Sequence, residues 1–253
     1  MTSKFNKWMK SLVAAAAFAC VAATAQDSDP DAAKWAYGIT EPINDVTLSA
    51  PLAGVIGARL AKEGEIVKQG SPVVELDKRL EELEVERRKL VLDQRKTDLD
   101  STMSLFEKKA ISISREEMDK RKADFNIAQV EFELAKEQLR KRQIIAPFEG
   151  AVTDLFLEVG ESCQSQQALV RLVDTRRCYF IANVEAKAGH GLKVNQQVQL
   201  EIDSGATTVP VKGSVYFVSP VVDPASGLMK VKVIFENADG KIRPGVAGRL
   251  KLD

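Results

Sequence analysis

Side chains that commonly carry catalysis or bind metals are few in this chain and widely spaced. Its 253 residues include one histidine, His190, and three cysteines, none of them in a Cys-x-x-Cys pair. There is no Ser/His/Asp set at a recognisable spacing and no glycine-rich phosphate-binding loop. Metal sites and nucleophilic centres need several such groups together. We therefore expect no enzymatic activity, no resident cofactor and no metal site.

The remaining candidates have structural interpretations. Met103, Met118 and Met229 are scattered, whereas soft metal ions need clustered sulfur or imidazole ligands. Asp77 and Asp174 close two apolar runs and are expected to end strands rather than to do acid–base work. The chain has 36 basic and 36 acidic residues, so no basic excess favours binding to nucleic acid.

The first 25 residues have the pattern of a secretory signal peptide. Three lysines precede an apolar run at 12–22, and Ala23-Thr24-Ala25 supplies small residues for cleavage after Ala25. Lipidation at Cys20 is the weaker alternative, because Ala17-Phe18-Ala19 fits such a site poorly. We therefore expect export to the periplasm, with association with the inner membrane left open.

Two cysteines remain in the exported chain, Cys163 and Cys178. Export makes a disulfide chemically possible, but sequence alone does not establish the spacing that one needs. Two buried, unpaired thiols are the alternative, and both stay open.

A sequence repeat, interrupted by a long insertion, organises the middle of the chain. Residues 50–76 and 146–172 align without a gap at an offset of 96 residues, with Ala-Pro and Gly-Glu at matching positions. Short runs punctuated by proline and glycine predict two equivalent halves of one β-structure. We expect these halves, 46–77 and 143–174, to form a flattened barrel-sandwich hybrid of the biotinyl/lipoyl kind. Neither half has the Met-Lys pair that usually bears a carrier's cofactor.

The insertion at 78–142 is predicted to be an antiparallel coiled-coil hairpin. Apolar residues recur every seven positions in two series, Val85, Leu92, Leu99, Phe106 and then Met118, Phe125, Phe132, Leu139. The residues from Ser114 to Glu117 fit a capping box at the start of the second helix. We expect the loop to lie near 108–113 and its residues to be largely exposed. In the middle of the two series, Leu92, Leu99, Phe125 and Phe132 are expected to be buried against the partner helix.

The flanking segments complete an α+β fold that is mainly β. Residues 26–45 are expected to be a polar, turn-rich lead-in. After the second half, 175–253 contain strand candidates at 179–185, 197–202, 209–218, 229–235 and 247–252, with turn signals between them. Such spacing predicts a small β-barrel.

Motifs at 50–55, 64–70, 113–119, 145–152, 219–223 and 242–246 occur in the order and at the spacing of a known family. Together they resemble the periplasmic adaptor proteins, or membrane fusion proteins (HlyD-like), of tripartite efflux and secretion systems. The resemblance implies a non-catalytic adaptor, a homo-oligomeric ring of six protomers, between an inner-membrane transporter (RND or ABC type) and an outer-membrane channel. It places channel binding at the hairpin tip: Leu105, Lys108, Lys109, Ile111, Ser112, Ile113 and Ser114.

Two departures from the family pattern accompany this resemblance. Many relatives for resistance-nodulation-division pumps have a further membrane-proximal domain, so this sequence is expected to be a short form without it. Channel-docking relatives often have Arg, then Leu, then Ser; Leu105 and Ser112 keep the second spacing, but Ser101 stands at the Arg position.

Two other functions remain open besides the adaptor of an efflux or secretion system. One is a carrier or envelope scaffold without a transport role, and the other is an adaptor of a heavy-metal efflux pump.

Overall fold

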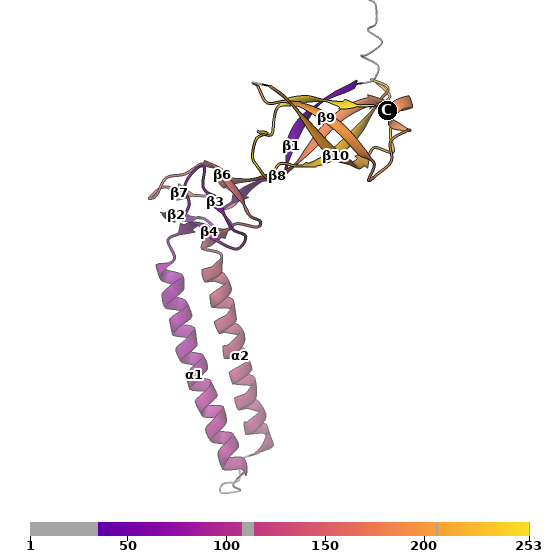
Figure 1. Ribbon diagram of the computed structural model, residues 1–253. Coiled ribbons are helices and arrows are strands. Elements are labelled where there is room, and N and C mark those ends of the chain that lie inside the picture. The colour runs from indigo at the N-terminus through magenta and orange to yellow at the C-terminus, as the bar shows by residue number, and fades with distance from the viewer. Residues whose placement is uncertain (1–34, 108–113, 206, 253) are drawn as a thin grey trace, which may run out of the picture. The chain divides into compact units, whose positions relative to one another are not determined.

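The computed structural model describes residues 35–107, 114–205 and 207–252 (Figure 1). It is mainly β with two long helices, which confirms the predicted fold class. In chain order the elements are β1 (Trp35–Ser49), β2 (Gly54–Arg59), β3 (Ile66–Val67), β4 (Pro72–Leu76), α1 (Arg79–Glu107), α2 (Arg115–Arg140), β5 (Gln143–Ile145), β6 (Gly150–Leu155), β7 (Ser162–Cys163), β8 (Ala168–Glu185), α3 (Ala186–Gly189), β9 (Gln197–Asp203), β10 (Thr208–Val218), β11 (Leu228–Glu236) and β12 (Ala247–Lys251).

The two halves of the repeat fold alike and bond to each other reciprocally. β2 and β3 of the first half correspond to β6 and β7 of the second. The Gly64 N–H donates to the Val152 carbonyl at 2.8 Å, and the Gly160 N–H donates to the Ile56 carbonyl at 2.9 Å. The two donors occupy equivalent positions of the repeat, and so do the two acceptors. The sandwich therefore has an approximate internal two-fold symmetry.

The repeated Gly-Glu pair makes a tight turn in each half. Gly64 and Gly160 have φ of 83° and 92°, where a side chain would be strained. The following glutamates, Glu65 and Glu161, each accept a backbone N–H three residues earlier, at 3.0 and 2.9 Å. The turn chemistry therefore explains why this dipeptide occurs in both copies.

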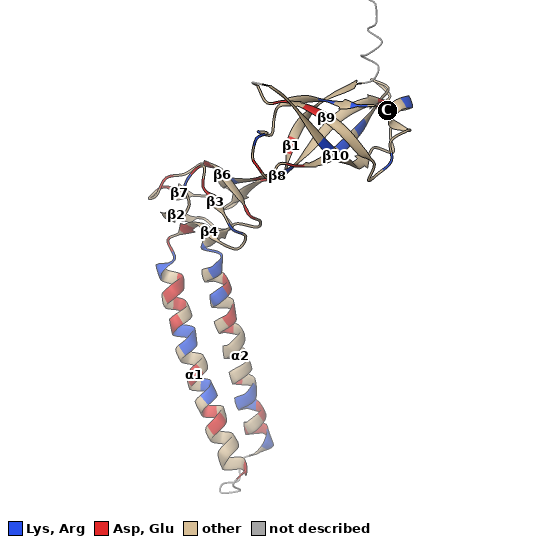
Figure 2. Ribbon diagram, in the orientation of Figure 1, with Lys and Arg blue, Asp and Glu red and all other residues tan. Residues whose placement is uncertain are grey.

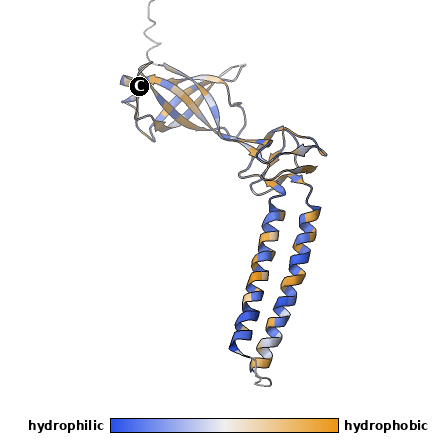
Figure 3. Cartoon of the chain, turned by 180° about the vertical axis from the view of Figure 1, so that it is seen from behind, coloured by the Kyte–Doolittle hydropathy of each residue, from blue (hydrophilic) through white to orange (hydrophobic). Residues whose placement is uncertain are grey.

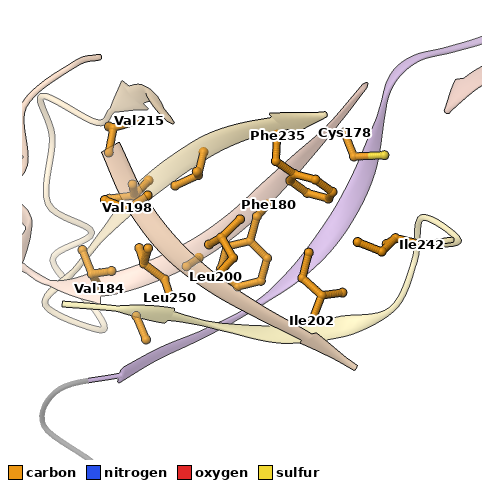
Figure 4. Close-up of a cluster of buried hydrophobic side chains, with 14 of the residues drawn as sticks. Cys178, Phe180, Val184, Val198, Leu200, Ile202, Val215, Phe235, Ile242 and Leu250 are labelled. Atoms are coloured by element: carbon orange, nitrogen blue, oxygen red, sulfur yellow. The ribbon is translucent and has the colours of Figure 1, made fainter. Parts of the chain in front are cut away.

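One core fills the sandwich and another fills the barrel. The sandwich core includes the fully buried residues Ile56, Val73, Leu76, Val152, Val170 and Leu172. The barrel is closed by six strands in the order β1-β12-β9-β10-β11-β8, with β8 pairing back to β1. Figure 4 shows its interior, where Phe180, Leu200, Ile202 and Leu250 meet. Along β9 and β11 every second residue is buried and those between are half-buried or exposed, so one face of each strand points inward.

The structure differs from the sequence prediction where the sandwich and the barrel meet. The expected lead-in up to residue 45 and the strand expected from Val46 are, over the described residues, the single strand β1. It pairs with β8 from Gly38↔Ala182 to Ser49↔Ala168, so both strands run through the barrel and the sandwich within one eight-stranded sheet. A register shift between Pro42 and Asn44 accommodates residues whose types indicate turns.

Both described cysteines are free and buried. Cys163 belongs to the sandwich core and Cys178 to the barrel core. The two-thiol alternative is therefore the one that the structure has. Burial raises the pKa of the Cys178 thiol to about 11, which keeps it protonated and unreactive near neutral pH.

Candidate functional site: the helical hairpin

Polar contacts join the base of the hairpin to the sandwich. The Arg142 guanidinium donates to the Glu81 carboxylate at 2.5 Å and to the Ala53 carbonyl at 3.1 Å. Beside it, Lys78 donates to the Glu75 carboxylate at 2.6 Å, and this bond lowers the pKa of that carboxyl. Both helices therefore leave the sandwich from anchored positions.

The predicted seam faces the partner helix but is less buried than expected. Four seam residues are only half-buried: Leu92, Leu99, Phe125 and Phe132. In the two helices the fully buried residues are Ala128 and Ala135. Two helices alone leave the sides of every seam residue open to water. These four side chains were expected to be buried, and the structure has them only partly buried.

The ends of the seam differ further from the sequence prediction. Phe106 was expected on the seam, but it is 47% exposed.

An ion pair also joins the two helices. Arg88 of α1 pairs with Glu131 of α2 across the hairpin, and Arg88 also pairs with Glu84 at 2.8 Å. This cross-helix pair shows which levels of the two antiparallel helices lie side by side.

The start of α2 shows half of the predicted capping box. The Ser114 hydroxyl accepts the Glu117 N–H at 3.1 Å, as an N-cap does. The Glu117 carboxylate pairs instead with Arg121 at 3.0 Å. Glu116 and Glu117 also place negative charge at the helix N-terminus, which the helix dipole favours.

Two of the seven residues predicted for partner binding lie in the described part of the chain. Leu105 is half-buried in α1, and Ser114 is exposed at its cap position. Lys108, Lys109, Ile111, Ser112 and Ile113 lie outside the described residues. Docking through the tip therefore stays a prediction.

Sequence reasoning missed a second set of apolar residues, on the faces of the hairpin that point away from the seam. Leu83 and Leu90 of α1, and Ile127, Val130 and Leu134 of α2, are each more than half exposed. We call them the outer stripes. Figure 3 shows apolar residues along both helices, and Figure 2 shows the charged residues among them.

The sequence did contain a signal for the outer stripes. Leu83 and Leu90 are seven residues apart, as are Ile127 and Leu134, so each helix has a second series at coiled-coil spacing. Because Arg88 and Glu131 are paired, Leu90 and Val130 lie near the same level. A helix with two such faces is suited to contact two neighbours.

The described residues contain no group of three or more His, Cys, Asp or Glu side chains arranged to hold a metal ion. Of the described helices, none combines the length and apolar character that crossing a membrane would require.

A hairpin inserted between the halves of a barrel-sandwich hybrid, followed by a six-stranded barrel, defines the membrane fusion class of protein. Residues 44–175 match the family described as RND MFP, barrel-sandwich hybrid domain. Residues 180–253 match the CusB-like β-barrel domain. The chain belongs to the RND membrane fusion protein family.

Relatives and solved structures agree with this assignment. The chain is 27% identical to membrane fusion protein MtrC of Neisseria gonorrhoeae, over 85% of this chain and 58% of MtrC. It is 25% identical to the toluene efflux pump periplasmic linker protein TtgD of Pseudomonas putida, over 77% of this chain and 54% of TtgD. It thus spans little more than half the length of these relatives.

Among solved structures, a MacA-MexA chimeric protein containing the Pseudomonas aeruginosa MexA α-hairpin domain aligns with a TM-score of 0.74 at 20% identity, covering 87% of this chain and 78% of the chimera. A putative efflux transporter from Bacteroides eggerthii aligns with a TM-score of 0.69 at 21% identity, covering 86% and 67% of the two chains. These likenesses show the shared fold.

Proposed function

We propose that this protein is a periplasmic adaptor that links an inner-membrane transporter to an outer-membrane channel for efflux or secretion. Family membership, and the efflux-linker names of its relatives, support this role. The adaptor acts by geometry: it holds its partners at a set distance and passes conformational change between them. The stiffness of the hairpin suits this task, because its base is anchored and its helices pair along their length.

The outer stripes are the structural observation that favours assembly of this adaptor as a ring of copies. A hairpin working alone would gain nothing from apolar residues that face water on both helices. If the α2 stripe of one copy packs on the α1 stripe of the next, both are covered by one repeated contact. Such a head-to-tail contact generates a ring when its rotation closes. The family resemblance suggests six copies.

Val130→Asp tests this contact. A carboxylate in the middle of the α2 stripe is exposed in the single chain, so folding and helix content should stay unchanged. Association of copies should be lost, because the contact would bury an unpaired charge. Sedimentation velocity of both proteins measures the effect, with Gln129→Asp as the matched control on the same helix. Equal association of all three proteins would contradict the ring contact.

We also propose that the hairpin tip, from Leu105 to Ser114, contacts the outer-membrane channel. The support is the family resemblance and the paired isoleucines, Ile111 and Ile113. Ile111→Asp and Ile113→Asp should abolish transport, or capture of the channel, while leaving the melting temperature nearly unchanged. A large fall in melting temperature would instead indicate that these residues stabilise the end of the coiled coil. Unchanged transport would also argue against docking.

A further inference from the structure

A pocket lies on the outer face of the barrel, over three neighbouring strands. Its volume is about 390 Å³, and it is lined by Gln197, Val198, Gln199, Lys212 and Lys251. These residues come from β9, β10 and β12, with β9 in the middle (Figure 1). We call it the lysine pocket. Pockets that hold small molecules have volumes of roughly 300 to 1,000 Å³, so this one has room for a small ligand.

Strand pairing places the two lysines on either side of β9. Lys212 pairs with Gln199. On the other side Leu250 pairs with Leu200, so the next residue of β12, Lys251, lies beside Gln199 as well. Neighbouring strands are roughly 4.8 Å apart, which puts the two lysine backbones about 10 Å from each other. Because each ammonium group sits on a flexible stem, both can reach one group held over Gln199.

The two lysines of the pocket have no counter-charge from the chain. Both are exposed, and neither forms an ion pair with any residue of 35–107, 114–205 or 207–252. The acid next along the outer face of β9 is Glu201, and Arg249 binds it at 2.6 Å. Arg249 also lies over the Trp35 ring, 4.3 Å from its centre. The nearby carboxylate is thus already neutralised, and the two lysines remain available to an anion from outside.

Two amide side chains lie between the lysines. Gln197 and Gln199 are both exposed, and within the described part of the chain their amides form no side-chain hydrogen bond. Each amide offers two N–H donors and one acceptor. Of the described residues that line the pocket, none is acidic, and none is a histidine or a cysteine. This set of donors is suited to an oxyanion rather than to a metal ion.

We propose that the lysine pocket binds a phosphate monoester through its phosphoryl group. Such a group carries a charge of about −2 near neutral pH and three strong acceptor oxygens, which match two lysines and two amides. A single carboxylate would leave one lysine without a partner. The remaining volume accommodates the rest of the ester. This site goes beyond the adaptor function proposed above, and it does not depend on the hairpin or on the ring contact.

Charge removal tests the site directly, with glycerol 3-phosphate as the probe and phosphorus NMR at low ionic strength as the measurement. Lys212→Gln and Lys251→Gln should each weaken binding roughly tenfold, because each removes one charged hydrogen-bond donor. The double variant should not bind measurably, whereas Lys212→Arg should still bind. Lys230→Gln, an exposed lysine on β11, is the matched control. Equal binding by the wild type and the double variant, or no saturable binding by the wild type, would overturn the proposal.

The charge of the ligand is tested by pH and by a second probe. A phosphate monoester loses its second charge below a pH of about 6. Glycerol 3-phosphate should therefore bind several-fold more weakly at pH 5 than at pH 8, and acetate should bind more weakly than the ester at both. The charged groups around the site are Lys212, Lys251 and the paired Glu201 and Arg249. Equal affinities at the two pH values, or acetate binding as tightly as the ester, would refute a site for a dianion.

The monoester can come from a soluble molecule or from a lipid headgroup, and vesicles distinguish the two sources. Phosphatidylcholine vesicles with phosphatidic acid present a monoester, whereas those with phosphatidylglycerol present a diester. Cosedimentation with the first kind only, lost in the double variant, would support the site and identify a headgroup. Binding of the soluble ester without binding to either vesicle would support it as a site for a free ligand. Equal cosedimentation with both vesicles in wild type and double variant, without binding of the soluble ester, would overturn it.

Discussion

At the scale of single residues, Asp174 has a different position in the structure from the one that the sequence predicts. It was expected to end a strand, but it lies inside β8 and is buried. Arg176 surrounds its carboxylate, with the backbone N–H at 3.1 Å and two guanidinium nitrogens at 3.0 and 2.9 Å. These hydrogen bonds, the side-chain bond first, hold the pKa of the Asp174 carboxyl below its usual range.

Asp174→Asn should lower the free energy of unfolding by about 2 kcal/mol at neutral pH, because charged hydrogen bonds are lost. A depressed folded-state pKa stabilises the fold above the unfolded value of about 4, and this contribution is lost as the pH falls through the folded pKa. The difference between variant and wild type should therefore shrink in acid. Urea unfolding across that range measures it. Asp93→Asn, an exposed site, should change little, and a pH-independent deficit would contradict the electrostatic cause.

At the scale of elements, most apolar side chains of the hairpin are only partly buried. Its seam pairs half-buried apolar side chains with two buried alanines, and no residue of α1 is fully buried. An isolated helix pair cannot enclose its own seam, so most of the helices' apolar surface remains accessible. The hairpin therefore contributes less stability per residue than either β-core.

Phe132→Ala should destabilise the hairpin by less than the 3 to 5 kcal/mol that is roughly typical for a fully buried phenylalanine. Phe106→Ala, at the exposed end of α1, should cost no more than about 0.5 kcal/mol. Thermal unfolding followed by helix circular dichroism compares the two variants. Equal losses would mean that Phe106 is covered in solution, and a loss at Phe132 above that range would indicate a dry seam.

At the scale of the whole molecule, the family assignment rests on how the modules are ordered. The barrel-sandwich hybrid and the barrel are each matched by their own family description, and the hairpin is inserted between the halves of the first. The two long strands β1 and β8 run through both the sandwich and the barrel within one eight-stranded sheet. Backbone hydrogen bonds of that sheet therefore join the sandwich to the barrel.

Export is the expected first step for this protein, and its signal lies outside the described residues. We predict cleavage after Ala25, because a basic segment, a short apolar run and small residues precede that bond. Intact-mass measurement of protein recovered from the periplasm should give a chain that starts at Gln26. A retained Met1, or a lipidated chain starting at Cys20, would show that the prediction is wrong.

Local patterns in the sequence were enough to predict the repeat, its glycine turns, most barrel strands and both long helices. These depend on neighbours in the chain: positive φ at Gly64 and Gly160, alternation along strands, and seven-residue spacing along helices. The family resemblance followed from the order of those same motifs.

Only the tertiary structure decided which distant residues meet. Strand pairing carried β1 through the expected lead-in, since its partner β8 satisfies its backbone groups across the turn-like residues. Strand pairing in the barrel also brought the rings of Tyr179 and Tyr216 together, with centroids 5.2 Å apart, although nothing local relates them. Burial of Asp174 and exposure of the outer stripes likewise depend on what packs nearby, because solvent access is a property of the assembled surface.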